Sequence, residues 1–249
     1  MELREFFEQY PEVAIAFSGG VDSAYLLYAA RKYAKRVKAY YVKTAFQPQF
    51  ELDDAKRLAV DLGTEMEVLE ADILRDSAVV SNPDDRCYHC KKKLFSHILK
   101  ASREDGFSVL LDGGTNASDD ASDRPGMRAI AELSIRSPLR ECGLTKESIR
   151  QLSREAGLFT HDKSAYACLA TRIPVGETIT AGKLQRTEYA EDCLTALGFR
   201  DFRVRSMGDM AKIQIREEDL ELAMTHRKEI LNELKRHYTG VLLDLEVRK

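Results

Sequence analysis

The sequence lacks any hydrophobic run long enough to cross a membrane. Its longest strand-like apolar stretch, residues 13–17, falls far short of the roughly 20 residues that a transmembrane helix needs. Residues 1–10, MELREFFEQY, are acidic and polar-patterned, which predicts neither a signal peptide nor a transit sequence. We therefore expect a cytoplasmic protein that has no membrane partner.

The chain also lacks a charge excess and a disulfide framework. Its 38 Lys and Arg against 41 Asp and Glu leave a net charge of −3, which argues against a protein that coats nucleic acid broadly. Five cysteines are an odd number in a 249-residue chain, which is long enough to bury a core without disulfides. Reduced thiols with a chemical role are the better interpretation.

Short apolar runs alternate with amphipathic stretches along the first part of the chain. Strands are expected at 13–17, 37–42, 66–69 and 109–111, and helices at 2–10, from 23 to about 36, at 52–62 and at 90–103. This alternation indicates βα units and a parallel sheet. Beyond them we expect helices at 145–157, 181–197 and 219–235, and strands at 202–204, 211–215 and 241–247. We interpret residues 1–165 as the main α/β domain and residues 166–249 as a smaller α+β domain.

The hexapeptide SGGVDS at residues 18–23 lies between an expected strand and an expected helix. Its two glycines allow a tight turn whose backbone amides, together with the helix N-terminus, favour an anion. A plain glycine turn would explain an isolated Gly-Gly pair, but the whole hexapeptide in this context favours a phosphate site. It has neither the Gly-Lys-Ser/Thr ending of a P-loop nor the G-x-G-x-x-G of a dinucleotide site. The candidate nucleotide-binding residues here are Ala16, Ser18, Gly19, Gly20, Asp22 and Ser23, with Asp22 orienting the loop or helping to place a metal ion.

Cys87 and Cys90 stand three residues apart at the start of an expected helix, followed by three lysines. Helix-start amides and nearby lysines favour the thiolate form. Taken alone, the pair fits half of a zinc site, a redox pair or iron–sulfur ligands. Cys168 is a third candidate, in an irregular segment of the kind that often carries active-site residues. Cys142 and Cys193 match no motif and are interpreted as half-buried apolar side chains, with Cys142 as a zinc ligand the alternative.

Further polar candidates follow the expected strands, because open α/β sheets bind ligands at their carboxyl edge. Lys43, Thr44, Gly114 and Asn116 are expected near the nucleotide, and Asp119, Asp123 and Arg128 around the substrate. Arginines suit phosphate oxygens, and the candidates for a substrate phosphate are Arg140, Arg172, Arg203 and Arg205. The alternative interpretation of the candidates at 114–128 is a solvated loop, and that of Arg203 and Arg205 is an exposed strand face.

Four blocks of the sequence resemble the LarE family of ATP-dependent sulfur transferases, which help to build the nickel-pincer cofactor of lactate racemase. They are SGGVDS at 18–23, which is similar to the loop of PP-loop ATP pyrophosphatases, RCYHCKKKLF at 86–95, DGGTNASDDASDRPGMRAIAELSIRSPL at 112–139 and ACLATRIPVGETIT at 167–180. The resemblance implies a PP-loop parallel sheet with helices on both faces and a homo-oligomer. It also implies use of ATP and Mg²⁺ to adenylate a pyridinium carboxylate mononucleotide, followed by attack of sulfur and release of AMP.

In that family the sulfur comes either from a sacrificed cysteine at the position of Cys168 or from sulfide on a [4Fe-4S] cluster held by three cysteines. Cys87, Cys90 and Cys168 match the three-cysteine pattern, which implies a catalytic and metal-binding role for all three. Inorganic sulfide or a donor protein would then supply the sulfur. The chain departs from the family at Met207 and Gln214, where His and Glu are common, and in the absence of a glycine-rich tail. The family's carboxylate metal site and hexamer contacts are therefore not carried over.

Two other functions are weighed against this one. A tRNA thiolase or related desulfurase of the same superfamily would need a basic RNA-binding surface, which the net charge of −3 speaks against. A non-catalytic nucleotide-binding protein with a structural zinc would need a fourth zinc ligand. An N-terminal cysteine amidotransferase is disfavoured because Glu2 follows Met1.

Overall fold

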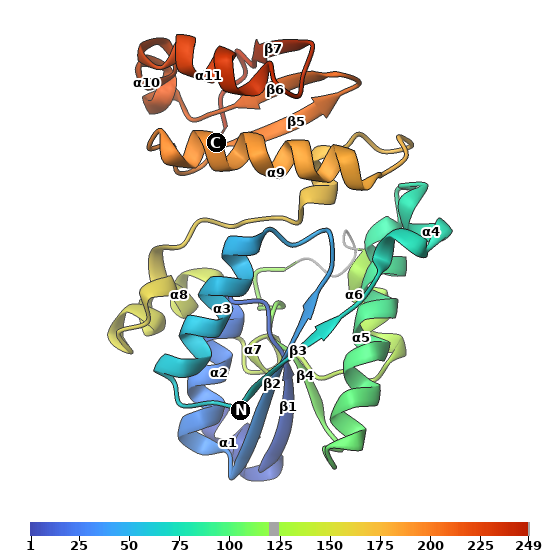
Figure 1. The fold of residues 1–249 in the computed structure, drawn as a ribbon. Coiled ribbons are helices and arrows are strands. Elements are labelled where there is room, and N and C mark those ends of the chain that lie inside the picture. The colour runs from blue at the N-terminus through green and yellow to red at the C-terminus, as the bar shows by residue number, and fades with distance from the viewer. Residues whose placement is uncertain (120–124, 249) are drawn as a thin grey trace. The chain divides into compact units, whose positions relative to one another are not determined.

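The computed structural model describes residues 1–119 and 125–248, which form two compact units (Figure 1). The first unit comprises residues 1–73 and 85–165. The second comprises residues 74–84 and the chain from Tyr166 onward. The chain thus passes from the first unit into the second at residue 74 and returns to the first at residue 85. No local sequence pattern predicts this grouping. No helix among the described residues combines the length and apolar character that crossing a membrane requires.

The first unit is built on a parallel four-stranded sheet in the order β3-β2-β1-β4. The strands are β1 Glu12–Ala16, β2 Arg36–Lys43, β3 Met66–Glu70 and β4 Leu110–Asp112. Its helices are α1 Leu3–Gln9, α2 Val21–Tyr33, α3 Gln49–Asp61, α5 Arg86–Glu104, α6 Pro125–Glu132, α7 Pro138–Glu141 and α8 Lys146–Glu155, with the 3₁₀ turns η1 Ile73–Arg75, which ends in the second unit, and η2 Phe159–Asp162. Helices cover both faces, α1, α2, α3 and α8 on one and α5 and α6 on the other (Figure 1). The predicted parallel α/β sheet with helices on both faces is confirmed.

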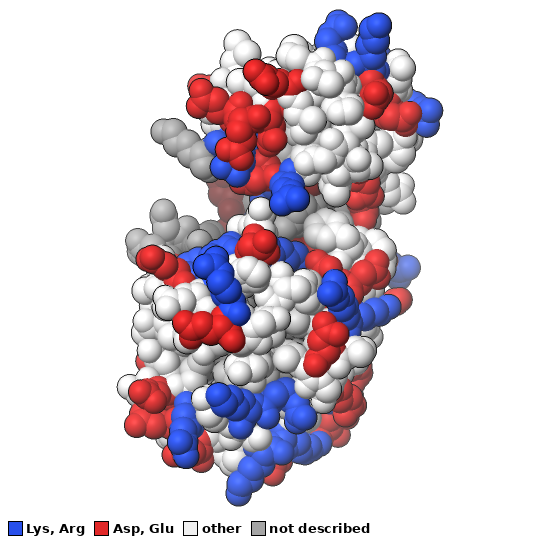
Figure 2. All heavy atoms as spheres, turned by 90° about the vertical axis from the view of Figure 1, so that its left-hand side faces the viewer, with Lys and Arg blue, Asp and Glu red and all other residues white. Residues whose placement is uncertain are grey.

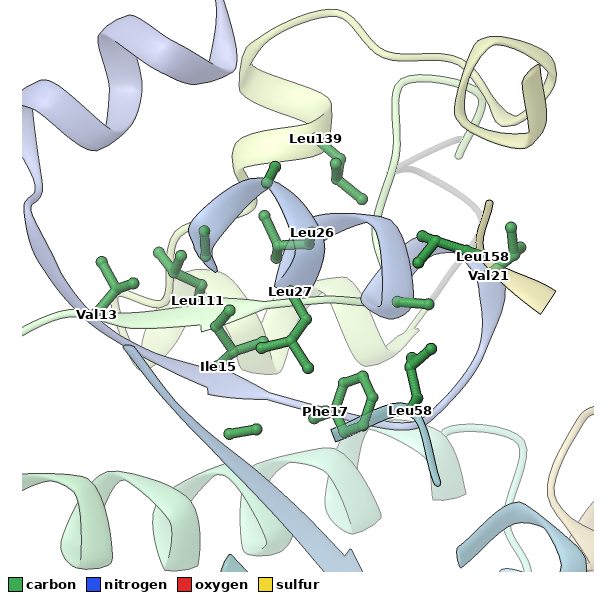
Figure 3. Close-up of a cluster of buried hydrophobic side chains, with 14 of the residues drawn as sticks. Val13, Ile15, Phe17, Val21, Leu26, Leu27, Leu58, Leu111, Leu139 and Leu158 are labelled. Atoms are coloured by element: carbon green, nitrogen blue, oxygen red, sulfur yellow. The ribbon is translucent and has the colours of Figure 1, made fainter. Parts of the chain in front are cut away.

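Strand β1 separates two hydrophobic cores because its side chains alternate between the faces of the sheet. Val13 and Ile15 of β1, and Phe17 directly after it, point into the core shared with α2 and α3 (Figure 3). They pack there with Leu26, Leu27 and Leu58. Ala14 joins the core under α5 and α6 on the other face. Burial on both faces explains why the strand reads as a continuous apolar run rather than an alternating one.

The second unit packs helices against a three-stranded sheet in the order β5-β6-β7, with β5 and β6 antiparallel and β6 and β7 parallel. Its elements are α4 Ser77–Val80, η3 Leu169–Arg172, α9 Ala181–Ala196, β5 Arg203–Met207, β6 Met210–Gln214, η4 Glu217–Asp219, α10 Leu220–Thr225, α11 Arg227–Leu234 and β7 Gly240–Leu243. Val204, Ala211 and Ile213 of the sheet pack with Leu194 of α9 and Leu234 of α11. The smaller α+β unit is as predicted.

Two elements of this unit differ from the sequence prediction. The single helix expected at 219–235 is broken at His226, between α10 and α11. The Thr225 hydroxyl donates to the Glu221 carbonyl oxygen at 2.9 Å, a back-bond that bends helices. The last strand ends at Leu243 instead of residue 247, because Asp244 Oδ1 accepts a hydrogen bond from the amide of Glu246 and starts a turn.

Basic and acidic side chains are interspersed on the surface. On the face drawn in Figure 2, Lys and Arg are interspersed with Asp and Glu over both units, with several blue side chains next to one another toward the bottom of the view.

Lys38 on β2 is the centre of a charged cluster in the first unit. Its ammonium contacts Asp105 at 2.5 Å, Glu67 at 2.8 Å and Glu65 at 3.1 Å, and the Tyr40 hydroxyl also donates to Asp105. Burial by itself lowers the pKa of Lys38, but the three carboxylates outweigh it, so the pKa rises above its usual value. Burial and the hydrogen bond to Asp105 also raise the pKa of Tyr40.

These raised pKa values predict a loss of stability at alkaline pH. Above about pH 10 the unfolded chain releases protons from Lys38 and Tyr40 that the folded chain retains, so the free energy of unfolding falls as the pH rises. Urea unfolding between about pH 9 and pH 11.5 should show this fall, with a shallower slope in Tyr40→Phe. Tyr33→Phe replaces an exposed tyrosine and should keep the wild-type slope. A wild-type slope in Tyr40→Phe would contradict the assignment.

Candidate active site

The predicted phosphate loop, residues 18–23 and named so below, connects β1 to the N-terminus of α2. Gly19 has φ of +73°, and a Cβ atom there would lie 3.1 Å from the Cβ of Ala55 on α3. Only glycine meets both the left-handed backbone and the close approach of α3. The hydroxyls of Ser18 and Ser23 lie 3.1 Å apart, and Ser23 also donates to the Gly20 carbonyl oxygen. The loop is therefore ordered by its own hydrogen bonds at a helix N-terminus that favours anions.

Asp22 is the buried carboxylate of this loop, with 8% of its surface exposed. Both of its oxygens lie 2.8 Å from the ammonium of Lys146, the first residue of α8. The Asn116 side-chain amide donates to Asp22 Oδ2 at 3.2 Å. Two segments far apart in the sequence thus hold the carboxylate in one orientation.

The loop after β4 lies against the phosphate loop. Asp112 pairs with Ala16 across the sheet, and a Cβ atom on Gly113 would lie 2.7 Å from the Cβ of Ser23. Asp112 Oδ1 accepts a hydrogen bond from the Gly114 amide. Asp112 Oδ2 is buried and has no hydrogen-bond partner among the described residues. A buried carboxylate oxygen of this kind suits a ligand hydroxyl.

Asn116 and Asp119 shape the rest of this loop. The Asn116 amide donates to Asp119 Oδ2 at 2.9 Å, and the Ser118 amide donates to Asn116 Oδ1 at 2.8 Å. Asn116 therefore joins the loop to Asp22 through its side chain while its backbone is fixed by Asp119. Asp123, a further candidate, lies outside the described residues.

Lys43 and Thr44 lie at the carboxyl end of β2, where the sequence places them. Lys43 Nζ donates to the Gln47 carbonyl oxygen at 2.6 Å, and the buried Thr44 hydroxyl donates to Gln47 Oε1 at 2.8 Å. These contacts fix the turn between β2 and α3.

Arg128 of α6 packs on the aromatic ring of Tyr88, which belongs to α5. Its guanidinium lies 3.7 Å from the centre of the Tyr88 ring and 3.6 Å from Glu132. Lys92 joins the same cluster through Tyr88 and Glu132. Arg128 therefore helps to attach α6 to α5, a role its sequence position did not suggest.

Cys87 and Cys90 lie at the start of α5, which begins at Arg86. The Cys87 side chain is exposed and that of Cys90 is half-buried. A spacing of three places both thiols on one side of the helix, near its N-terminal end. The Arg86 guanidinium lies 3.8 Å from Cys87 Sγ.

Cys168 belongs to the second unit, where it is half-buried and stands just before η3. Arg172, at the end of η3, is 2% exposed and forms a buried ion pair with Glu191 of α9 at 2.7 Å. Its Nη1 donates to the Ala167 carbonyl oxygen and to the Thr171 hydroxyl. Each nitrogen of the Arg172 guanidinium thus donates to a group of the protein.

Arg203 and Arg205 lie two residues apart on β5, so they share a face of the strand. The guanidiniums of Arg203 and Arg172 lie 5.4 and 4.7 Å from the centre of the Tyr166 ring. Arg205 donates to the Thr171 carbonyl oxygen at 2.9 Å. Burial, and then repulsion from Arg172, lowers the pKa values of Arg203 and Arg205, as expected where positive charges gather.

Arg140 and the two remaining cysteines lie elsewhere. Arg140 is in α7 of the first unit. Cys142 and Cys193 pack against the hydrophobic cores of the first and second units, and burial raises the pKa of both thiols. Across residues 1–119 and 125–248, no three His, Cys, Asp or Glu side chains gather closely enough to hold a metal ion.

Sequence reasoning missed Lys146, Glu191 and the role of Asp112. Lys146 carries no motif, and only the packing of α8 beside α2 brings it to the phosphate loop. Glu191 reads as an ordinary helical glutamate, yet it is 5% exposed. Asp112 directly follows the apolar run of residues 109–111, and this place at the end of a buried strand was the available signal.

Comparisons with known proteins point to one group of enzymes. The family model of asparagine synthase matches residues 7–115, which include the phosphate loop and all four strands of the first sheet. An uncharacterized protein of Synechocystis sp. is 36% identical over 88% of this chain and 82% of its own length. A tRNA-specific 2-thiouridylase of Thermotoga petrophila is 27% identical over 61% of this chain and 54% of its own length.

A further relative is the pyridinium-3,5-bisthiocarboxylic acid mononucleotide synthase of Lactiplantibacillus plantarum. It is 33% identical over 207 residues, which make up 82% of this chain and 75% of that protein. The match confirms the family that the sequence motifs indicate. The chain belongs to the LarE family of PP-loop proteins and is an ATP-dependent sulfur-transferring enzyme.

Proposed function

We propose that this enzyme uses ATP to activate a carboxylate of a pyridinium carboxylate mononucleotide and then replaces a carboxylate oxygen with sulfur. The observation that carries the proposal is the phosphate loop at the N-terminus of α2, in a chain related to a synthase of a pyridinium bisthiocarboxylic acid mononucleotide. Arg203 and Arg205, which share one face of β5, support a phosphate-bearing substrate.

The first step is adenylation. A carboxylate oxygen of the substrate attacks the α-phosphorus of ATP, the bond to the bridging oxygen breaks, and pyrophosphate leaves with the bonding electrons. The amides and hydroxyls of the phosphate loop hold the phosphates, and Asp22 would help to hold a Mg²⁺ ion, which would supply neutralisation of the developing charge. The adenosine is assigned to residues at the carboxyl end of β2 and in the loop after β4, namely Lys43, Thr44, Gly114 and Asn116.

The second step transfers sulfur. A sulfur nucleophile attacks the carbonyl carbon of the acyl adenylate, and AMP leaves to give a thiocarboxylate. Arg203 and Arg205 are assigned to the substrate phosphate, since their fixed N–H donors suit phosphate oxygens. Arg172 is assigned a supporting role instead, because its N–H groups already bond to Glu191 and to the backbone. The sulfur donor and a homo-oligomeric state stay predictions.

Cys87, Cys90 and Cys168 are proposed to hold a [4Fe-4S] cluster. Two observations support this: thiolates are the ligands of iron–sulfur clusters, and Cys87 and Cys90 share one side of a helix start. When bound, a cluster with three protein thiolates supplies an iron position that is open to sulfide. Sacrifice of the Cys168 sulfur is the alternative, supported by the half-exposed place of this thiol in an irregular segment.

Iron and sulfide analysis after strictly anaerobic purification tests the cluster. We expect a brown protein with broad visible absorption, and loss of both iron and absorption in Cys87→Ala. Cys193→Ala is the matched control, because this thiol packs in the hydrophobic core of the second unit, and it should keep its iron. A colourless, iron-free protein that transfers sulfur while Cys168 becomes dehydroalanine would establish the sacrificial route instead.

A further inference from the structure

The ion pair between Lys146 and Asp22 puts a cation on the only carboxylate of the phosphate loop sequence. The ammonium lies 2.8 Å from each carboxylate oxygen, so it spans both. The Asp22 side chain is 11% exposed, whereas that of Lys146 is 36% exposed. The carboxylate is thus enclosed, while the lysine has room to move.

The backbone of Lys146 is held in place by the N-terminal cap of α8 and by the loop after β4. Thr145 caps α8 by accepting from the Ser148 amide at 3.2 Å. The Lys146 amide donates to the Ser118 hydroxyl at 3.0 Å, and the Ala117 amide donates to the Leu144 carbonyl oxygen at 2.8 Å. The start of α8 is therefore attached to the same loop after β4 whose Asn116 contacts Asp22. This attachment fixes the backbone of Lys146, while its flexible side chain can move from one hydrogen-bond partner to another.

The charges of this arrangement conflict with the binding of ATP·Mg²⁺. Asp22 is the carboxylate available to a Mg²⁺ ion at the loop, but both of its oxygens already face the Lys146 ammonium. Mg²⁺ prefers carboxylate and phosphate oxygens, and a second cation on the same two oxygens would be repelled. The ammonium and Mg²⁺ would therefore compete for Asp22 when the nucleotide binds.

We propose that Lys146 exchanges partners, leaving Asp22 to Mg²⁺ when ATP binds and placing its ammonium on the phosphates that depart as pyrophosphate. In the nucleotide-free enzyme Lys146 keeps Asp22 oriented in place of the metal. In the adenylation step it neutralises the charge that develops as the bond between the α-phosphorus and the bridging oxygen breaks. This role rests on the proposed adenylation and adds to it a residue that no sequence motif marks.

The test compares Lys146→Met, Lys146→Arg and the control Lys38→Met. Lys38 also pairs with a carboxylate of the first unit, Asp105, but it takes no part in the phosphate loop. Calorimetry measures the binding of ATP with Mg²⁺, and electron paramagnetic resonance measures the binding of Mn²⁺ without nucleotide. In Lys146→Met we expect ATP to bind about tenfold more weakly and Mn²⁺ to bind more tightly, because Asp22 is released. Adding Asp22→Asn should abolish the gain in Mn²⁺ binding.

Pyrophosphate release gives the second readout. Lys146→Met should lower its kcat about 100-fold, the scale of losing one charge-stabilising donor, and Lys146→Arg should restore part of it. Lys38→Met should lose thermal stability but keep wild-type ATP binding and kcat. Wild-type ATP affinity and kcat in Lys146→Met would overturn the proposal, as would weaker Mn²⁺ binding in that variant. If the wild type binds ATP but releases no pyrophosphate with any pyridinium carboxylate, the adenylation assignment fails while the two binding measurements still decide the role of Lys146.

Discussion

Replacing Gly113 by alanine should lower kcat/KM for pyrophosphate release about 100-fold, the scale of a small misplacement of reacting groups. A Cβ atom at this position would lie 2.7 Å from the Cβ of Ser23, 3.0 Å from the Ala16 carbonyl oxygen and 3.0 Å from the Ser23 Cα. Two of these three neighbours are backbone atoms, so no side-chain rotation relieves the contact. Either β4 or the start of α2 therefore has to move. Because Ser23 is the last residue of the phosphate loop, a shift of α2 would displace that loop.

The measurement is ATP affinity by calorimetry together with the pyrophosphate release rate, with circular dichroism to verify the fold. Gly182→Ala is the matched control, because Gly182 lies in the first turn of α9, has no atom within 4 Å of an added Cβ and needs no positive φ. It should keep wild-type ATP binding. Equal behaviour of the two variants would show that the contact between Gly113 and Ser23 does not shape the nucleotide site.

Much of the first unit could be predicted because its signals are local. The apolar run of β1, the glycines after it and the helix that follows are consecutive in the sequence, and the loop they form needs no distant information. The spacing of Cys87 and Cys90 and their position at the start of a helix are likewise local, and both could be predicted from the sequence. Parallel pairing then brings the residues after β1 and β4 to one edge of the sheet.

The parts that escaped prediction depend on tertiary packing. Nothing in the stretch GLTK identifies Lys146 as a partner of Asp22, since 123 residues separate them and only the packing of α8 beside α2 brings them together. Arg172 was expected to bind phosphate because arginine often does so. Its burial against Glu191 follows from the folding of the second unit, and a sequence pattern cannot distinguish a guanidinium that binds a ligand from one that binds a glutamate inside a core.

Removing the buried ion pair between Arg172 and Glu191 should strongly lower the free energy of unfolding of the second unit. Arg172 and Glu191 have side chains only 1% and 6% exposed, and Glu191 also accepts hydrogen bonds from the Tyr166 hydroxyl and the Val204 amide. Together these contacts connect η3, α9 and β5. In Arg172→Met the carboxylate of Glu191 would stay buried without its cation. Breaking a buried ion pair by removing one partner typically costs about 3–5 kcal/mol, so we expect unfolding of the second unit to become easier by that amount.

Hydrogen exchange of the α9 amides during urea titration follows this unit separately from the first. Arg216→Met is the matched control in the same unit, because Arg216 and Glu218 form a pair whose side chains are 47% and 62% exposed, and exposed pairs contribute about 0–1 kcal/mol. The double variant Arg172→Met/Glu191→Leu should recover part of the loss, since it removes the unpaired charge as well. Protection of α9 in Arg172→Met as high as in Arg216→Met would mean that the pair does not hold the second unit together. An unrecovered double variant would instead assign the loss to packing of the arginine side chain, whereas recovery would identify the uncompensated carboxylate as its cause.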